Sequence, residues 1–411
     1  MVNTERIPNG YHITEAGILP TEWQVKKLNE VVTELTERAG QDMYETVSIS
    51  AGIGFVNQAE KFGKELSGKQ YEKYIVLHKG DFSYNKGNSK TSPQGCIYRL
   101  NDRESAAVPN VFESFRIKEQ DADYYEQLFL SGFLNRQLYS RINRGVRDDG
   151  LLNLTGKDFY SCMVPVPPID EQKQIAKILA QCDKVIELKQ QRLEAEVERK
   201  KWLMNQLLHH PEKYRVPGFY GNWENATIGS ITSSFSGGTP TSSNSCYYSH
   251  QGIPFIRSGE IGESKTELYL SDQGFANSAA KMVKKGDLLY ALYGANSGEC
   301  FISKIDGAIN QAILCIRSET IDIRFLYYVL ASMKEWIVAT YLQGGQGNLS
   351  GAIIKKLKIS YPQKDEQQAI VKIIYSQDIV IDKLREELKK LEERKKALMQ
   401  LLLAGIVRVS I

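Results

Sequence analysis

Residues 167–208 read PPIDEQKQIAKILAQCDKVIELKQQRLEAEVERKKWLMNQLL, and residues 362–403 repeat this stretch as PQKDEQQAIVKIIYSQDIVIDKLREELKKLEERKKALMQLLL. The two copies align without a gap at a constant offset of 195, and about 19 of the 42 positions are identical. Unrelated segments would match at only a few positions, so the repeat records an internal duplication. Each copy has an Asp-Glu-Gln triplet near its start and Arg-Lys-Lys and a Leu pair near its end. The chain therefore reads as region, helix, region, helix.

Each copy predicts one long helix, because neither contains Pro or Gly between its Asp-Glu-Gln and its final Leu pair. About 33 residues give a helix of roughly 50 Å. Seam positions recur in alternating steps of four and three, the spacing that keeps one stripe of a helix facing a partner helix. We expect the helices to pack on each other antiparallel as a coiled-coil spacer with a two-fold pseudo-axis; two ordinary amphipathic helices in separate domains are the alternative. The apolar seam comprises Ile175, Leu179, Ile186, Leu193, Leu203 and Leu207 in the first copy, and Ile370, Ile374, Ile381, Leu384, Leu388, Leu391, Leu398 and Leu402 in the second.

The two regions that precede the helices are expected to be diverged copies of one domain. Lys79-Gly80-Asp81 with Tyr84 is echoed by Lys285-Gly286-Asp287 with Tyr290. Asn153-Leu154 with Gly156 is echoed by Asn348-Leu349 with Gly351, at the same offset of 195. Residues 253–256, 287–290 and 312–316 read as strands, whereas 123–141 and 323–342 carry helical periodicity.

The predicted fold class is therefore α/β (α+β), with two globular heads joined by the paired helices. We expect an N-terminal segment and first head over 1–165, a central spacer helix over 166–215, a second head over 216–361 and a C-terminal spacer helix over 362–411. Helices that stay similar beside heads that diverge suggest constant contacts at the spacer and variable recognition at the heads.

Composition describes an ordinary globular chain, with 42% hydrophobic and 25% charged residues among 411. No run of eighteen apolar residues exists and the N-terminus has no apolar signal segment, so we expect a cytoplasmic protein without a membrane span. The formal net charge of +3 is too small to indicate a nucleic-acid binder. Any DNA binding must therefore come from local patches.

A search for catalytic motifs finds none that holds. Residues 63–70 almost fit a phosphate-binding loop, but Gln70 stands where Ser or Thr must reach magnesium. The Asn/Asp-Pro-Pro-aromatic tetrapeptide associated with amino-group DNA methylation is missing from the sequence. The acidic pair at the start of each predicted helix is explained by the helix dipole, which favours carboxylates there. We therefore expect no catalytic residue and no metal site in this chain.

The positive signals concern DNA contact, because amide side chains read base edges and Lys and Arg bind phosphate or guanine. In the first head the candidates are the loop residues Tyr84, Asn85, Lys86, Asn88 and Lys90, and the cluster Arg141, Asn143, Arg144 and Arg147. In the second head the candidates are Arg257, Tyr293, Asn296, Asn310, Gln311, Gln343, Gln346 and Asn348.

Over nearly its whole length the chain resembles a specificity subunit of a Type I restriction–modification enzyme. The resemblance rests on the duplicated Asp-Glu-Gln helices, on an opening with Gly17, Pro20 and Trp23, and on the stretches 236–240, 253–259 and 344–349. The second opening departs from the pattern, with Gly221-Asn222 in place of the Pro before Trp223.

This resemblance implies two target-recognition domains, each reading one half of a bipartite, asymmetric double-stranded DNA sequence across a gap that the helical spacer sets. It also implies that the helices dock two methyltransferase subunits and that restriction subunits join the assembly. S-adenosylmethionine, ATP and magnesium would belong to those partners, and this chain would be non-catalytic. A two-headed coiled-coil scaffold that binds proteins is the main alternative, and an autonomous nuclease–methylase is a second one.

Overall fold

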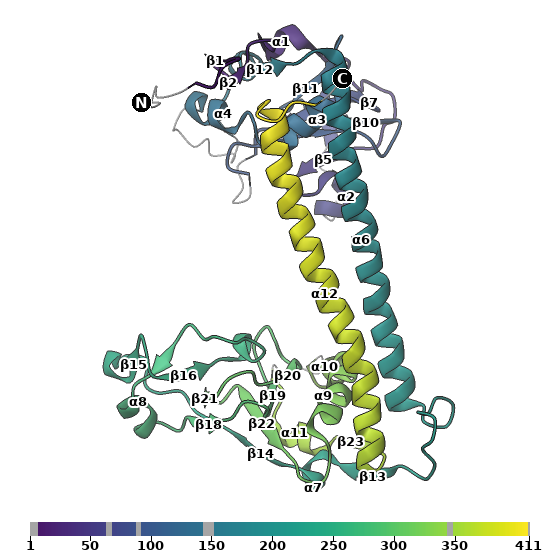
Figure 1. The fold of residues 1–411 in the computed structure, drawn as a ribbon, viewed down its shortest axis with the longest axis vertical. Coiled ribbons are helices and arrows are strands. Elements are labelled where there is room, and N and C mark those ends of the chain that lie inside the picture. Colours follow the sequence, from purple (N-terminus) through teal and green to yellow (C-terminus); the bar gives the residue numbers. More distant parts are fainter. Residues whose placement is uncertain (1–6, 63–67, 88–91, 143–151, 343–347, 410–411) are drawn as a thin grey trace. The chain divides into compact units, whose positions relative to one another are not determined.

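The computed structural model describes the chain except for residues 1–6, 63–67, 88–91, 143–151, 343–347 and 410–411. Its contacts divide into two units, Met1–Lys189 with Glu387–Ile411, and Gln190–Glu386. The dividing line crosses the two long helices, α6 (Ile169–His209) and α12 (Lys364–Leu403), which are coloured teal and yellow in Figure 1. With 41 and 40 residues, each helix is about 60 Å long. The prediction of one unbroken helix per repeat copy is confirmed.

The first head is built on a four-stranded antiparallel sheet in the order β4-β11-β8-β9. Its central strands, β11 (Glu113–Ile117) and β8 (Phe82–Asn85), bury Phe115 and Phe82 completely, and these two rings stack at a centroid distance of 5.5 Å. Phe129 of α3 (Ala122–Leu130) meets both rings edge-on, so this helix packs on the sheet. The other elements of this framework are β3 (Gln24–Lys27), α1 (Leu28–Val31), β4 (Val32–Glu34), β9 (Cys96–Arg99), α4 (Asn135–Arg141), α5 (Gly156–Tyr160) and β12 (Met163–Val166), with β3 paired to β12.

The second head repeats this framework in the same chain order. Its four-stranded sheet has the order β14-β22-β19-β20, and β13 (Glu224–Thr227) pairs with β23 (Lys358–Tyr361) as β3 pairs with β12. The prediction that the heads are diverged copies of one domain therefore agrees with their topology. The remaining matching elements are α7 (Ile228–Ile231), β14 (Ser233–Ser236), β19 (Leu288–Ala291), β20 (Cys300–Ile302), β22 (Ile313–Arg317), α9 (Ile323–Ser332), α10 (Lys334–Leu342) and α11 (Gly351–Lys356).

Outside this framework the heads differ. The first head adds two antiparallel strand pairs, the hairpin of β5 (Val47–Ser50) with β6 (Gly54–Asn57), and β7 (Ile75–His78) with β10 (Ser105–Val108), between which β8 and β9 lie in the chain. The second adds a five-stranded sheet of β15 (Tyr248–Ser249), β17 (Tyr269–Leu270), β16 (Ile253–Ile256), β21 (Gly307–Ile309) and β18 (Lys281–Val283). The shorter elements are β1 (Tyr11–Thr14), β2 (Gly17–Pro20), α2 (Gln58–Phe62), η1 (Gly68–Lys73), η2 (Ser245–Tyr247), η3 (Ser258–Glu260) and α8 (Asp272–Ala276).

The Lys-Gly-Asp echo marks the turn that enters the central strand of each sheet. Gly80 and Gly286 have φ angles of 96° and 97°, a conformation that glycine adopts without strain. The Asp that follows accepts two hydrogen bonds from an Arg on the neighbouring strand, Asp81 from Arg116 and Asp287 from Arg317. The echo thus preserves a structural ion pair.

Strands predicted near 253–256, 287–290 and 312–316 are present as β16, β19 and β22. The helical segment 123–141 is divided into α3 and α4, because Gly132 between them has a φ of 75° and ends the first helix. The segment 323–342 is likewise divided into α9 and α10.

The two long helices pack antiparallel in each unit. In the first unit Lys189 binds Glu387 and Asp183 binds Lys395, whereas in the second unit Lys200 binds Asp378. In these pairs the residue number rises along α6 as it falls along α12, so the two helices run antiparallel. Every predicted apolar seam residue is buried or half-buried. The first core contains Ile175, Leu179, Met399 and Leu402, and the second contains Met204, Leu208, Ile370 and Ile374.

Within the described residues, no helix combines the length and the apolar character that a membrane crossing requires.

Candidate nucleic-acid interface

Tyr84 belongs to the core of the first head. Its side chain is 0% exposed, its ring stacks on Phe159 at a centroid distance of 4.6 Å, and its hydroxyl donates to the Gln94 carbonyl at 2.7 Å. Burial raises the pKa of the Tyr84 hydroxyl. In this structure the ring therefore supports the strand that carries the neighbouring polar residues and offers no surface to DNA.

The next two candidates, Asn85 and Lys86, are held by contacts within the protein. Asn85 donates to the Ile49 carbonyl at 3.1 Å and accepts from the Gly87 amide at 2.8 Å. Lys86 Nζ lies 2.7 Å from Glu113 Oε1, and both side chains are about 15% exposed. The Lys86 charge is therefore compensated by a carboxylate. Asn88 and Lys90 lie outside the described residues.

Only Arg141 of the predicted basic cluster can be placed. It is the last residue of α4, is half-buried, and donates to the Gln137 carbonyl at 3.2 Å. Asn143, Arg144 and Arg147 lie outside the described residues.

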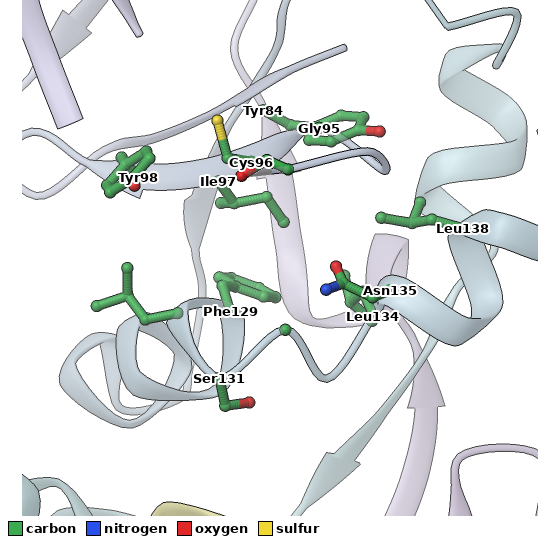
Figure 2. Close-up of a pocket in the computed structure, with 13 residues that line it drawn as sticks. Tyr84, Gly95, Cys96, Ile97, Tyr98, Phe129, Ser131, Leu134, Asn135 and Leu138 are labelled. Carbon is green, nitrogen blue, oxygen red and sulfur yellow. The ribbon is translucent and has the colours of Figure 1, made fainter. Parts of the chain in front are cut away.

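A cavity of about 210 Å³ lies beside these elements in the first head. Figure 2 shows Ile97 of β9 and Phe129 of α3 facing each other across it, with Leu138 of α4 at one side. All the residues that line it are uncharged, so the cavity offers no cationic side chain to a phosphate. We assign it no part in DNA binding.

In the second head, five candidates gather on one rim formed by strand ends. Arg257 follows β16, Tyr293 and Asn296 follow β19, and Asn310 and Gln311 lie between β21 and β22. Strand β16 runs parallel to β21, and β22 runs antiparallel to β19, so these ends meet at the same edge. We call this set, together with Thr239 after β14, the second-head rim.

Hydrogen bonds hold residues of the rim. Asn296 donates to the Ser258 carbonyl at 3.4 Å, and Thr239 donates to Gln311 Oε1 at 2.7 Å. Burial raises the pKa of the Tyr293 hydroxyl, while a hydrogen bond with the Gln311 side chain partly offsets the rise. These bonds form two groups at the rim, Asn296 with Ser258, and Gln311 with Thr239 and Tyr293.

Arg257 stands at the rim between two carboxylates. Its Nε lies 3.0 Å from Glu260 Oε2, and its Nη2 lies 2.5 Å from Glu267 Oε2. Burial opposes the charge on Glu260, but the hydrogen bonds from Arg257 and from two backbone amides outweigh it and lower the pKa of Glu260. The guanidinium is thus held in one orientation at the head surface.

Of the last three candidates in the second head, one lies near the same edge and two lie outside the described residues. Asn348 is exposed, and the amide of the adjacent Leu349 donates to the Leu292 carbonyl, next to Tyr293, at 2.9 Å. Gln343 and Gln346 lie outside the described residues.

The Asp-Glu-Gln triplets have a structural task that the helix-dipole interpretation missed. Glu171 is 0% exposed and receives Arg408 Nε at 2.7 Å, Arg408 Nη2 at 3.0 Å and Trp23 Nε1 at 2.9 Å. Its repeat equivalent, Glu366, is 2% exposed and receives Arg215 Nε and Nη2, both at 2.8 Å. We call Glu171 with Arg408 the first clamp and Glu366 with Arg215 the second clamp.

The Gln of each triplet ties the helix start to its own head. Gln172 accepts from the Asp121 amide at 3.0 Å and donates to the Pro167 carbonyl at 2.8 Å. Gln367 makes the equivalent bonds to Asp322 and Pro362, both at 2.7 Å. Asp121 and Asp322 cap α3 and α9, so the triplet joins the spacer to the helix that packs on the sheet.

The described part of the chain contains no grouping of three or more His, Cys, Asp or Glu side chains that is arranged to hold a metal ion.

Comparisons with known proteins agree on one family. The family model of the type I restriction modification DNA specificity domain matches residues 20–199 and again residues 220–393. A curated relative, the putative type I restriction enzyme MjaX specificity subunit of Methanocaldococcus jannaschii, is 27% identical over 428 residues, which cover 96% of each chain.

Two solved structures share the fold. A chain from work on complex assembly and conformational transition of the type I R-M system aligns with a TM-score of 0.62 at 17% identity, covering 95% of this chain and 99% of that one. The S subunit of a type I restriction–modification system from M. genitalium aligns with a TM-score of 0.57 at 13% identity, covering 99% and 98%.

Proposed function

Because the chain belongs to the family of type I restriction modification DNA specificity domains, it is the DNA-recognition subunit of such a system, and we propose that each head reads one half of a bipartite, asymmetric site. One observation carries this proposal. The family model matches twice, and each match contains a head with the same four-stranded sheet order. Two copies of one reading domain with different surface additions suit two different half-sites. The protein-binding scaffold is not favoured.

The second-head rim supplies the chemistry for reading bases. Amide groups of Asn and Gln match adenine edges, and Arg is the commonest partner of guanine. Asn296, Gln311 and Arg257 provide these groups at one edge of the head. Two glutamates orient Arg257, which lowers the entropy that the side chain loses when it meets a base.

We further propose that the paired helices set the gap between the half-sites and dock two methyltransferase subunits. Apolar side chains on the helix exterior support docking, because apolar groups exposed together mark protein interfaces. Val185 and Leu188 of α6 are 48% and 52% exposed, and Tyr375 and Ile379 of α12 are 52% and 53% exposed. Restriction subunits would join this assembly.

The same proposal leaves catalysis to the partners. S-adenosylmethionine would be bound by the methyltransferase subunits, and ATP and magnesium would be used by the restriction subunits. This chain contributes recognition and geometry.

The test combines the purified chain with its modification subunits and sequences DNA that the complex has methylated. We expect one asymmetric motif with two specified halves and an unspecified gap, and DNA binding that weakens steeply as salt rises because phosphate contacts release counterions. Methylation without any bipartite motif, or binding that salt leaves unchanged, would overturn the proposal.

A further inference from the structure

The first clamp joins two parts of the chain that are far apart in sequence. Arg408 follows the C-terminal helix, whereas Glu171 begins the central helix and Trp23 opens the first head. The C-terminal helix itself is preceded in sequence by the second head. Residues 405–409, which we call the tail, nevertheless lie in the first unit.

Four further contacts hold the tail against the first head. Tyr11 donates to the Gly405 carbonyl at 2.7 Å, and Arg408 Nη2 lies 2.7 Å from Glu22 Oε2. Gly405 has a φ of 65°, and a Cβ there would lie 2.5 Å from Pro20 Cγ. Val409 packs against the first hydrophobic core. The tail therefore packs against residues 20–23, at the start of the first head.

We propose that Arg408 is a positioning residue for the first recognition head, which it fixes to the spacer through Glu171. This inference rests on the proposed function, in which that head reads one half-site. A buried carboxylate that loses its partner is left uncompensated, and the segment around it must move to relieve the cost. Trp23 shares the Glu171 carboxylate, so the disturbance reaches the first strands of the head.

Because the second head has its own clamp, the loss of Arg408 should affect the first head and not the second. Arg215 and Glu366 both lie in the second unit, where Arg215 Nη1 also donates to the Gly221 carbonyl. Each head is thus held by its own arginine. Among the described residues Trp223 Nε1 is buried without a hydrogen-bond partner, so the second clamp lacks the indole that shares Glu171 in the first. We therefore expect Arg408 substitutions to disturb only the half-site that the first head reads, although the first head is farther from Arg408 in sequence than the second head.

The experiment measures methylation by the assembled complex on three duplexes, one with the full site and one with a single base change in each half. Discrimination is the ratio of the rate on the full site to the rate on each altered duplex. We expect R408A to lower discrimination at one half-site about tenfold, and R215A to lower it at the other half-site by a similar factor. Loss of folded protein would reduce all three rates by one factor and leave both ratios unchanged.

Conservative variants complete the test. R408K keeps the charge but loses the paired geometry of the guanidinium, so we expect discrimination between those of the wild type and R408A. If R408A lowers discrimination at both half-sites equally, or at neither, Arg408 is not a positioning residue for the first head. A wild-type complex that shows no bipartite discrimination would instead count against the proposed function itself, so the two failures are distinguishable.

Discussion

Lys200 Nζ lies 2.6 Å from Asp378 Oδ1, and the two residues that the repeat places in equivalent positions, Lys395 and Asp183, form the same ion pair in the first unit. Each aspartate also accepts a bond from its own head, Asp378 from the Tyr328 hydroxyl at 2.6 Å and Asp183 from Gln127 at 3.2 Å. Half-buried polar pairs of this kind specify the register and orientation of paired helices. The duplication has thus conserved one polar contact per unit within an apolar seam.

Removing the lysine of this pair should destabilise the second unit. We expect K200M to lower the free energy of unfolding by about 1–3 kcal/mol, because Asp378 keeps its charge and loses its cationic partner. K200M/D378N should lose less than the sum of the two single variants, since the uncompensated charge is gone while the amide still accepts from Tyr328. Urea unfolding measures all four proteins.

The exposed pair Lys184–Glu187 provides the control for that cycle, because its side chains are 62% and 53% exposed. K184M should change the free energy of unfolding by less than about 0.5 kcal/mol. Strict additivity of K200M and D378N would show that the two side chains do not interact.

Low pH should weaken the ion pair between Arg317 and Asp287, the residue that precedes the central strand β19 of the second head. Burial opposes ionisation of Asp287, but the hydrogen bonds from Arg317 and the Lys284 amide outweigh it and lower its pKa. A carboxyl whose pKa is lower in the folded state stabilises the fold above its unfolded pKa, near about 4, and this contribution is lost as pH falls through the folded pKa.

R317M should therefore be less stable than the wild type at neutral pH, and the difference should shrink as pH falls below about 4. Urea midpoints between neutral and acid pH provide the measurement, with R324M at an exposed position of α9 as the control. A difference that stays constant with pH would contradict the assignment of the effect to Asp287 ionisation.

The second-head rim makes a prediction about sequence preference. Q311A removes an amide that binds both Thr239 and Tyr293, and we expect it to reduce discrimination at one base of one half-site by about 1–3 kcal/mol. Methylation rates on duplexes changed at single positions measure this effect. Q273A, at an exposed position of α8, should leave every rate ratio unchanged. Equal weakening at all positions of both half-sites would exclude Gln311 as a base reader.

The helix pair and the relation between the heads could be predicted because the duplication exposes them. A seam such as Ile370, Ile374 and Ile381 repeats locally, and its spacing dictates which face is buried. The shared Lys-Gly-Asp motif was found for the same reason, since an ion pair that both heads need keeps its residues in both copies.

The clamps and the role of Tyr84 could not be derived in that way. Arg408 lies 237 positions from Glu171, and a carboxylate at a helix start has a sufficient local explanation in the helix dipole. Tyr84 precedes polar residues and so resembles a loop residue, but β8 continues to Asn85 and its alternation turns the Tyr84 ring into the core. The sequence does contain a signal for each feature. Arg215 and Arg408 each follow a Leu pair at a short distance, and Tyr84 has a counterpart in the second head, Tyr290.

The ruler role of the paired helices is tested most directly by a variant whose spacer is longer by one heptad in both helices, inserted after Lys189 and after Glu386, where the two units divide. Seven residues add about 10 Å at the helical rise, which corresponds to roughly three base pairs of duplex. Sequencing of methylated DNA should then reveal the same two half-sites with a gap longer by about three base pairs. The same half-sites with an unchanged gap would contradict the claim that the paired helices measure the distance between two reading heads.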